Sequence, residues 1–69
     1  MEDDPLDAAM RRVEEGADRI ERQARLVFWL ERDGHPLAPE ARRLLDLLRD
    51  AQTTAVRYLV AEEGRLARS

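Results

Sequence analysis

The sequence predicts an all-α fold, a single antiparallel helical hairpin, from three observations. In the first half of the chain, apolar residues recur at alternating steps of four and three, the spacing of a helix face that packs against another helix. In the second half, a leucine- and alanine-rich pattern of similar length repeats with helical spacing. Between them, residues 33–39 read Asp-Gly-His-Pro-Leu-Ala-Pro, a strong break signal. A chain of 69 residues holds one domain, so residues 1–69 are assigned to it.

The first helix is predicted over residues 5–33. Asp4 can cap its first turn, and Pro5 suits the first helical position, where an N–H would have no partner inside the helix. Gly16 interrupts the pattern at a cost of about 1 kcal/mol relative to alanine, and it can let another backbone come close. The face expected to pack on the second helix is a heptad-like seam over three repeats: Leu6, Met10, Val13, Ala17, Ile20, Ala24 and Val27.

The connection between the helices is predicted from its glycine and prolines. The first helix is expected to stop at Asp33, because Gly34 readily takes the left-handed conformation that ends helices and Pro36 prevents continuation. His35, the single histidine, follows this glycine, so its ring is expected to bond carbonyl groups at the end of the first helix. The second helix is predicted over residues 39–66, with Pro39 in its first turn.

The second helix carries an apolar arc roughly 180° wide, more than one neighbouring helix can cover. A short connection between two helices of similar length favours antiparallel pairing, so residues whose numbers sum to about 72 are expected to face each other. Gln23 and Gln52 fall near this contact, where buried polar residues can fix the register. The expected pairs are Val27 with Leu45, Ile20 with Gln52, Val13 with Leu59, and Leu6 with Leu66.

Both helices carry apolar residues outside this contact, and a core of this size is marginal without disulfides, metal or association. The simplest closure is a homodimer of hairpins that forms a four-helix bundle, and the alternative is docking on a larger protein. Trp29 is then either an aromatic anchor for that partner or a cover for the loop end of its own hairpin or dimer. The expected partner-binding residues are Leu26, Trp29, Leu30, Leu47 and Tyr58.

Catalysis and cofactor binding find no support in the sequence. The chain has no cysteine and one histidine, so a zinc site is not expected. Its three glycines are scattered and form no phosphate-binding loop. Arginines intervene between the acids Glu14, Glu15, Asp18 and Glu21, which indicates an ion-paired solvated face instead of a metal site. We therefore expect a small non-catalytic interaction or assembly protein that acts through apolar helix–helix contacts and needs no cofactor.

A nucleic-acid-binding regulator is the alternative from a different class. The 12 basic residues are all arginine, and two doublets, Arg11-Arg12 and Arg42-Arg43, could contact phosphates on a dimer surface. Acids stand close to both doublets, and the net charge is −3, which argues against this alternative.

No apolar run approaches the length of about 20 residues that crosses a membrane. The N-terminal residues 1–4 are Met-Glu-Asp-Asp and lack the apolar region of a signal peptide. The expected location is the cytoplasm, with no membrane insertion.

Residues 20–50 combine an Arg-Gln step, a leucine-rich helix end, an Asp-Gly-His turn and a second leucine-rich helix. The residues concerned are Arg22-Gln23, Leu26, Leu30, Asp33-Gly34-His35, Leu44-Leu45 and Leu48. In these features the chain resembles a group of short, uncharacterised bacterial two-helix proteins. The resemblance implies a helical hairpin and a bacterial origin, and it implies no activity. Residues 36–39 depart from the group's pattern, which more often has Asp or Thr as a cap after the histidine.

Overall fold

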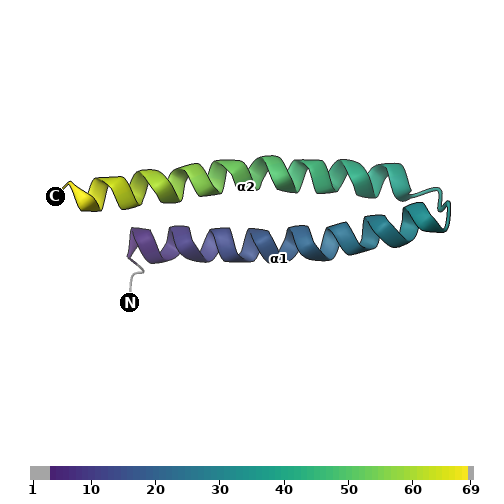
Figure 1. Cartoon of the computed structure of the whole chain (residues 1–69), viewed down its shortest axis with the longest axis horizontal. Coiled ribbons are helices and arrows are strands. Elements are labelled where there is room, and N and C mark those ends of the chain that lie inside the picture. The colour runs from purple at the N-terminus through teal and green to yellow at the C-terminus, as the bar shows by residue number, and fades with distance from the viewer. Residues whose placement is uncertain (1–3, 69) are drawn as a thin grey trace.

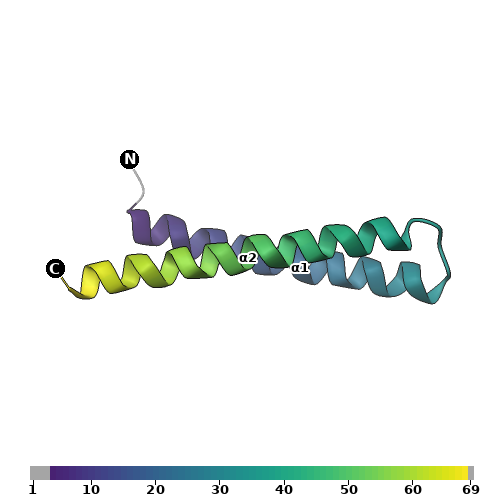
Figure 2. The same ribbon diagram turned by 90° about the horizontal axis from the view of Figure 1, so that it is seen from above.

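The computed structural model describes residues 4–68, which form two α-helices packed side by side in opposite directions (Figure 1). Helix α1 spans Pro5–Arg32 and helix α2 spans Ala38–Ala67, so the predicted all-helical hairpin is confirmed. The molecule measures 53 × 23 × 13 Å, which makes it two helices wide and one helix thick. Seen from above, the helices cross at a shallow angle (Figure 2). The pairing of hairpins into a four-helix bundle stays a prediction.

Helix α1 begins as the sequence predicts. Asp4 Oδ1 accepts a hydrogen bond from the Leu6 backbone N–H at 2.9 Å, and Pro5 holds the first position. Residues 1–3, which belong to the N-terminal segment predicted not to be a signal peptide, lie outside the described residues. Farther along, Glu21 and Arg25 form an ion pair at 3.8 Å, which contributes little because both side chains are about two-thirds exposed.

The turn after α1 is closed by backbone hydrogen bonds that Gly34 makes possible. Its φ of 64° lets the His35 N–H reach the Leu30 carbonyl at 2.9 Å and its own N–H reach the Glu31 carbonyl at 3.2 Å. This pair of bonds is the Schellman motif, so the predicted helix end is confirmed within one residue. The prediction for the His35 ring was wrong, because Nδ1 accepts a hydrogen bond from the Leu37 N–H at 3.0 Å. The ring therefore supports the start of α2, not the end of α1.

Helix α2 begins at Ala38, one residue earlier than predicted, with Pro39 in its first turn. Leu37 occupies the cap position and makes no side-chain capping bond. The bonds of its N–H to the His35 ring and of the Ala38 N–H to the His35 carbonyl, at 3.0 Å each, take the place of such a cap. At the other end, α2 extends past the start of α1 (Figures 1 and 2).

The core between the helices is small. Its centre is a cluster of Val27, Ala41 and Leu45, which lies in the half of the hairpin nearer the loop. Three half-buried residues pack against this cluster: Ile20, Ala24 and Leu30. Val27 and Leu45 are the largest fully buried side chains, and their predicted pairing is confirmed.

The predicted seam of α1 is correct in part. Leu6, Val13, Ile20, Ala24 and Val27 are buried or half-buried, whereas Met10 is 45% exposed and Ala17 is exposed. Ala9 and Gly16 face α2 in their place. At 100° per residue, the predicted seam is centred roughly 45° away from the side of α1 that faces α2. Helix α2 therefore covers only one side of a broad apolar stripe.

Two glutamines join the helices through backbone carbonyls. Gln23 Nε2 donates to the Ala41 carbonyl at 2.9 Å, and Gln52 Nε2 donates to the Val13 carbonyl at 2.8 Å. Each helix thus receives one bond from the other, as expected of polar residues that set a register. The Gln52 amide lies over Gly16, one turn away from Ile20, the residue predicted to face it. The helix ends account for half of this four-residue offset, because Arg32 and Ala38 sum to 70 instead of 72 and move the residue that faces Gln52 by two positions.

Candidate interaction surfaces

Most large apolar side chains of the described residues lie on the surface. Five hydrophobic residues are buried, and three of them are alanines, whereas eleven large hydrophobic residues are at least 41% exposed. A soluble monomer normally keeps contiguous apolar patches small, and larger ones mark interaction sites. The apolar residues of this chain therefore exceed what two helices can cover, as the sequence predicts.

One broad side of the hairpin carries a row of shallow hollows along the junction of the helices. Residues seven apart lie on the same side of a helix, and two such rows border these hollows. We call this surface the groove face and define it by Arg12, Arg19 and Leu26 of α1 with Leu37, Leu44, Ala51 and Tyr58 of α2.

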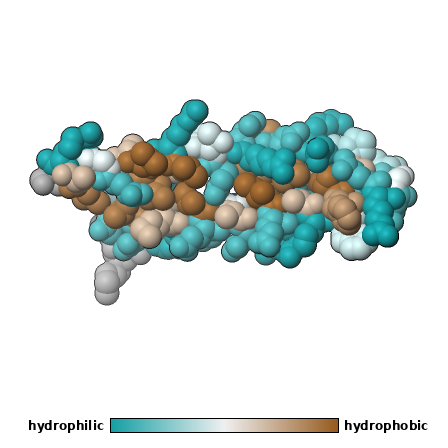
Figure 3. All heavy atoms as spheres, viewed as in Figure 1, coloured by the Kyte–Doolittle hydropathy of each residue, from teal (hydrophilic) through white to brown (hydrophobic). Residues whose placement is uncertain are grey.

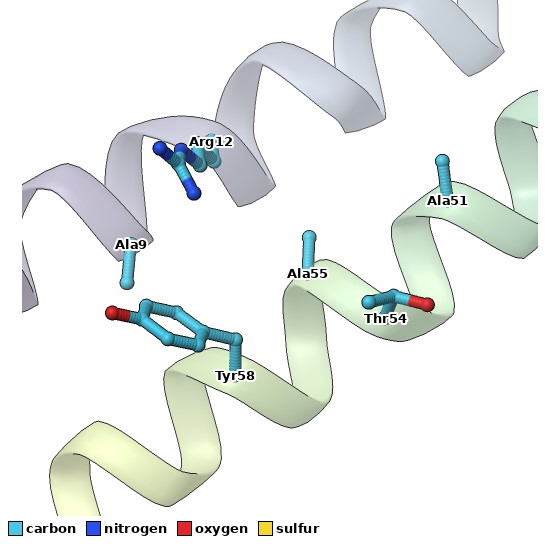
Figure 4. Close-up of a pocket in the computed structure, with 6 residues that line it drawn as sticks. All are labelled: Ala9, Arg12, Ala51, Thr54, Ala55 and Tyr58. Atoms are coloured by element: carbon cyan, nitrogen blue, oxygen red, sulfur yellow. The ribbon is translucent and has the colours of Figure 1, made fainter.

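The hollow nearest the open end of the hairpin has a volume of about 310 Å³ (Figure 4). Ala9, Ala51 and Ala55 form its floor because their side chains are short, and the Tyr58 ring and the Arg12 guanidinium border it. A neighbouring hollow of about 200 Å³ is lined by Gly16, Gln52 and charged residues of α1, namely Arg12, Glu15 and Arg19.

The hollow at the loop end is larger, about 360 Å³, and more leucine-rich. Leu26 and Leu30 of α1 border it together with Leu37 and Leu44. Glu40 and Gln23 supply its polar rim. Shallow, apolar and open, these hollows resemble a groove for a helix more than an enclosed pocket for a small molecule.

The opposite broad side carries a second apolar surface. We call it the opposite face and define it by Met10, Ala17 and Phe28 of α1 with Val56 and Val60 of α2. Figure 4, which looks onto a hollow of the groove face, shows α1 above α2, whereas Figure 1 shows α2 above α1. Figure 3 has the same view as Figure 1 and therefore shows the opposite face. Apolar atoms follow the junction between the helices along most of its length there.

Trp29 lies on the outer side of α1. Its ring contacts Phe28 edge-to-face, with centroids 5.3 Å apart, and the Arg32 guanidinium lies 5.3 Å from the ring centroid. It is 54% exposed, so it does not cover the end of the core within this chain. Its exposure leaves it accessible as an anchor for a partner.

The predicted partner-binding residues occupy three environments. Leu26 and Tyr58 lie on the groove face, while Trp29 and Leu47 point outward. Leu30 is half-buried, because it packs against the Val27 cluster as well as lining the loop-end hollow. Sequence reasoning did not single out Leu37, Leu44, Met10, Phe28, Val56 and Val60 as surface residues. The width of the apolar stripes indicated that some of these residues would be exposed. The sequence did not show which side of each stripe the other helix covers.

Charged residues are spread along the rod. Arg11 and Arg12 lie near its open end and Arg42 and Arg43 near its loop end, so the two doublets predicted for nucleic acid are not brought together within the chain (Figure 1). Arg65 donates to Glu62, and this hydrogen bond, together with the carboxylate charge, raises the pKa of Arg65 above its usual value.

Within residues 4–68, no cluster of three or more histidine, cysteine or acidic side chains could hold a metal ion. Across the same residues, no helix contains a stretch suited to crossing a lipid bilayer. Comparisons with family models, with curated proteins and with solved structures find no match to this chain. The resemblance over residues 20–50 therefore stays an expectation.

Proposed function

We propose that this protein is a small non-catalytic interaction or assembly protein that acts through apolar helix–helix contacts, as a homodimer, as an accessory subunit on a larger protein, or as both. The observation that carries the proposal is the excess of exposed over buried apolar side chains on a rod one helix thick. Two helices cannot cover each other's stripes, so further helices are needed to complete the core.

The groove face is the proposed docking surface for a different protein. Its hollows accept apolar side chains at helical spacing, the way an amphipathic helix is recognised by a groove. Arg12 and Arg19 line it, and the α2 residues that share those two hollows carry no charge. A partner helix that presents leucines and carboxylates would fill the hollows and pair with these arginines.

A capture experiment with three baits tests this proposal: wild type, Leu44→Glu, and Ala61→Glu as a matched control. Ala61 is exposed and lies on the outer side of the same helix, so both variants add one carboxylate to α2. We expect a protein held by wild type and by Ala61→Glu at high salt and lost with Leu44→Glu, because apolar contacts resist salt. Equal capture by all three baits would contradict the groove-face assignment.

A binding measurement with duplex DNA or RNA at low and high salt separates the nucleic-acid alternative. Phosphate contacts weaken steeply as salt rises, whereas apolar docking does not. If the chain binds duplex DNA or RNA, and Arg12→Ala or Arg43→Ala abolishes that binding while Leu44→Glu does not, the interaction-protein proposal fails.

A further inference from the structure

We infer that the opposite face is covered by a second copy of this chain, turned about the long axis of the rod so that both loops lie at the same end. The inference rests on the proposed function and names one of its partners. In this arrangement α1 of each copy lies along α2 of the other, and every neighbouring pair of helices in the bundle is antiparallel.

The first support is the apolar stripe of α1. The heptad-like seam of α1 is centred between the direction of α2 and the direction of the opposite face. A helix that packs against two neighbours is expected to have such a seam. Met10, Ala17 and Phe28 form the half of the stripe that α2 leaves open. The stripe therefore implies a second helix beside α1, on this face.

The second support is charge. Glu14 and Glu21 lie seven residues apart along the outer border of the α1 stripe, and Arg42 and Arg49 lie seven apart on the α2 side of the same face. When α1 lies along α2 of the second copy in the register of the hairpin itself, Arg49 lies level with Glu21. Glu14 and Arg42 lie one heptad farther along, toward the open end and the loop end, so a row of acids runs beside a row of arginines.

The same two-fold arrangement brings apolar residues of the two copies together at the open end. Met10 of one copy meets Val56 and Val60 of the other, which are 41% and 62% exposed in the single chain. The other two-fold arrangement, with loops at opposite ends, would bring α1 against α1 and set glutamates opposite glutamates, which is unfavourable. Charge thus selects the arrangement with both loops together.

The third support is area. The broad face of the hairpin measures 53 by 23 Å, roughly 1,200 Å², and each partner of a standard stable interface contributes about 800 Å². The groove face fits a second copy less well, because Arg12 and Arg19 would lie along the uncharged middle of the second α2. The opposite face is therefore the one assigned to self-association.

Charge reversal with rescue tests the inference on the full chain. Glu14→Arg with Glu21→Arg is expected to raise the dimer dissociation constant, measured by sedimentation, by roughly tenfold or more, since like charges then face each other. Adding Arg42→Glu and Arg49→Glu should restore the dimer. A matched control, Asp18→Arg with Asp50→Arg, changes the net charge equally on the outer sides of the helices and should leave the dimer intact.

Engineered cysteines test the orientation, because the chain has none of its own. A mixture of Met10→Cys with Val56→Cys should form a disulfide-linked dimer under mild oxidation, and a mixture of Met10→Cys with Phe28→Cys should not. The reverse result, or a failure of the charge rescue, would overturn the inference. A monomer that still captures a protein through the groove face would overturn it too, while the proposed function would stand.

Discussion

Gly34 lies at the one position, among the residues described, where the backbone requires positive φ. A Cβ added there would meet no atom within 4 Å, so a substitution acts through backbone strain alone. The left-handed conformation costs an L-residue roughly 1–2 kcal/mol. Because the loop holds the two helices in register, strain at this position is expected to lower the free energy of unfolding of the whole hairpin.

Gly34→Ala is therefore expected to lower the free energy of unfolding by roughly 1 kcal/mol. Gly64→Ala is the matched control, because Gly64 also has open space around it but lies in a helix. That change should raise stability by as much as about 1 kcal/mol, since alanine favours helix over glycine. Urea unfolding of both variants measures the difference, and equal effects would contradict this account of the loop.

At the scale of the helices, Gly16 and Gln52 set how α1 and α2 meet. A Cβ on Gly16 would collide with the Gln52 amide, which donates across the seam to Val13. Glycine at position 16 has a lower helix propensity than alanine, but it leaves room for the hydrogen bond from Gln52 to Val13. The two effects are of similar size, about 1 kcal/mol each, so they must be separated by a double-mutant cycle.

Gly16→Ala alone is expected to change the free energy of unfolding little, because the gain in helix propensity offsets the lost hydrogen bond. In a Gln52→Ala background, the same change should stabilise by about 1 kcal/mol, since no amide remains to be displaced. Thermal or urea unfolding of the four proteins gives the coupling. The absence of any coupling would show that Gln52 does not lie over Gly16.

The helix ends and the antiparallel pairing were predictable from the sequence, and the side of each apolar stripe that faces the other helix was not. Asp4, Pro5 and Gly34 act within one turn of the chain, so the helix ends follow from the residues alone. Which side of the α1 stripe faces α2 depends on packing between distant residues, and an arc this broad admits more than one answer. That is why Met10 and Ala17 were placed in the core and Phe28 was not recognised as exposed.

At the scale of the whole molecule, the hairpin has two apolar faces and very little interior. Leu45 and Val27 are the largest fully buried side chains, so the apolar area that one chain buries on folding is small. Charge differs between the two faces, and we propose that the opposite face binds a second copy and the groove face a carboxylate-bearing helix of another protein. Folding and association are then expected to be coupled.

The most direct test of this account is the mass in solution of the full chain over a dilution series, with helix content followed by circular dichroism in the same samples. We expect twice the chain mass of 8.0 kDa at high concentration and a loss of helix content as dilution separates the copies. A monomer that keeps its full helix content and thermal stability at every concentration would contradict the claim that the apolar faces require further helices.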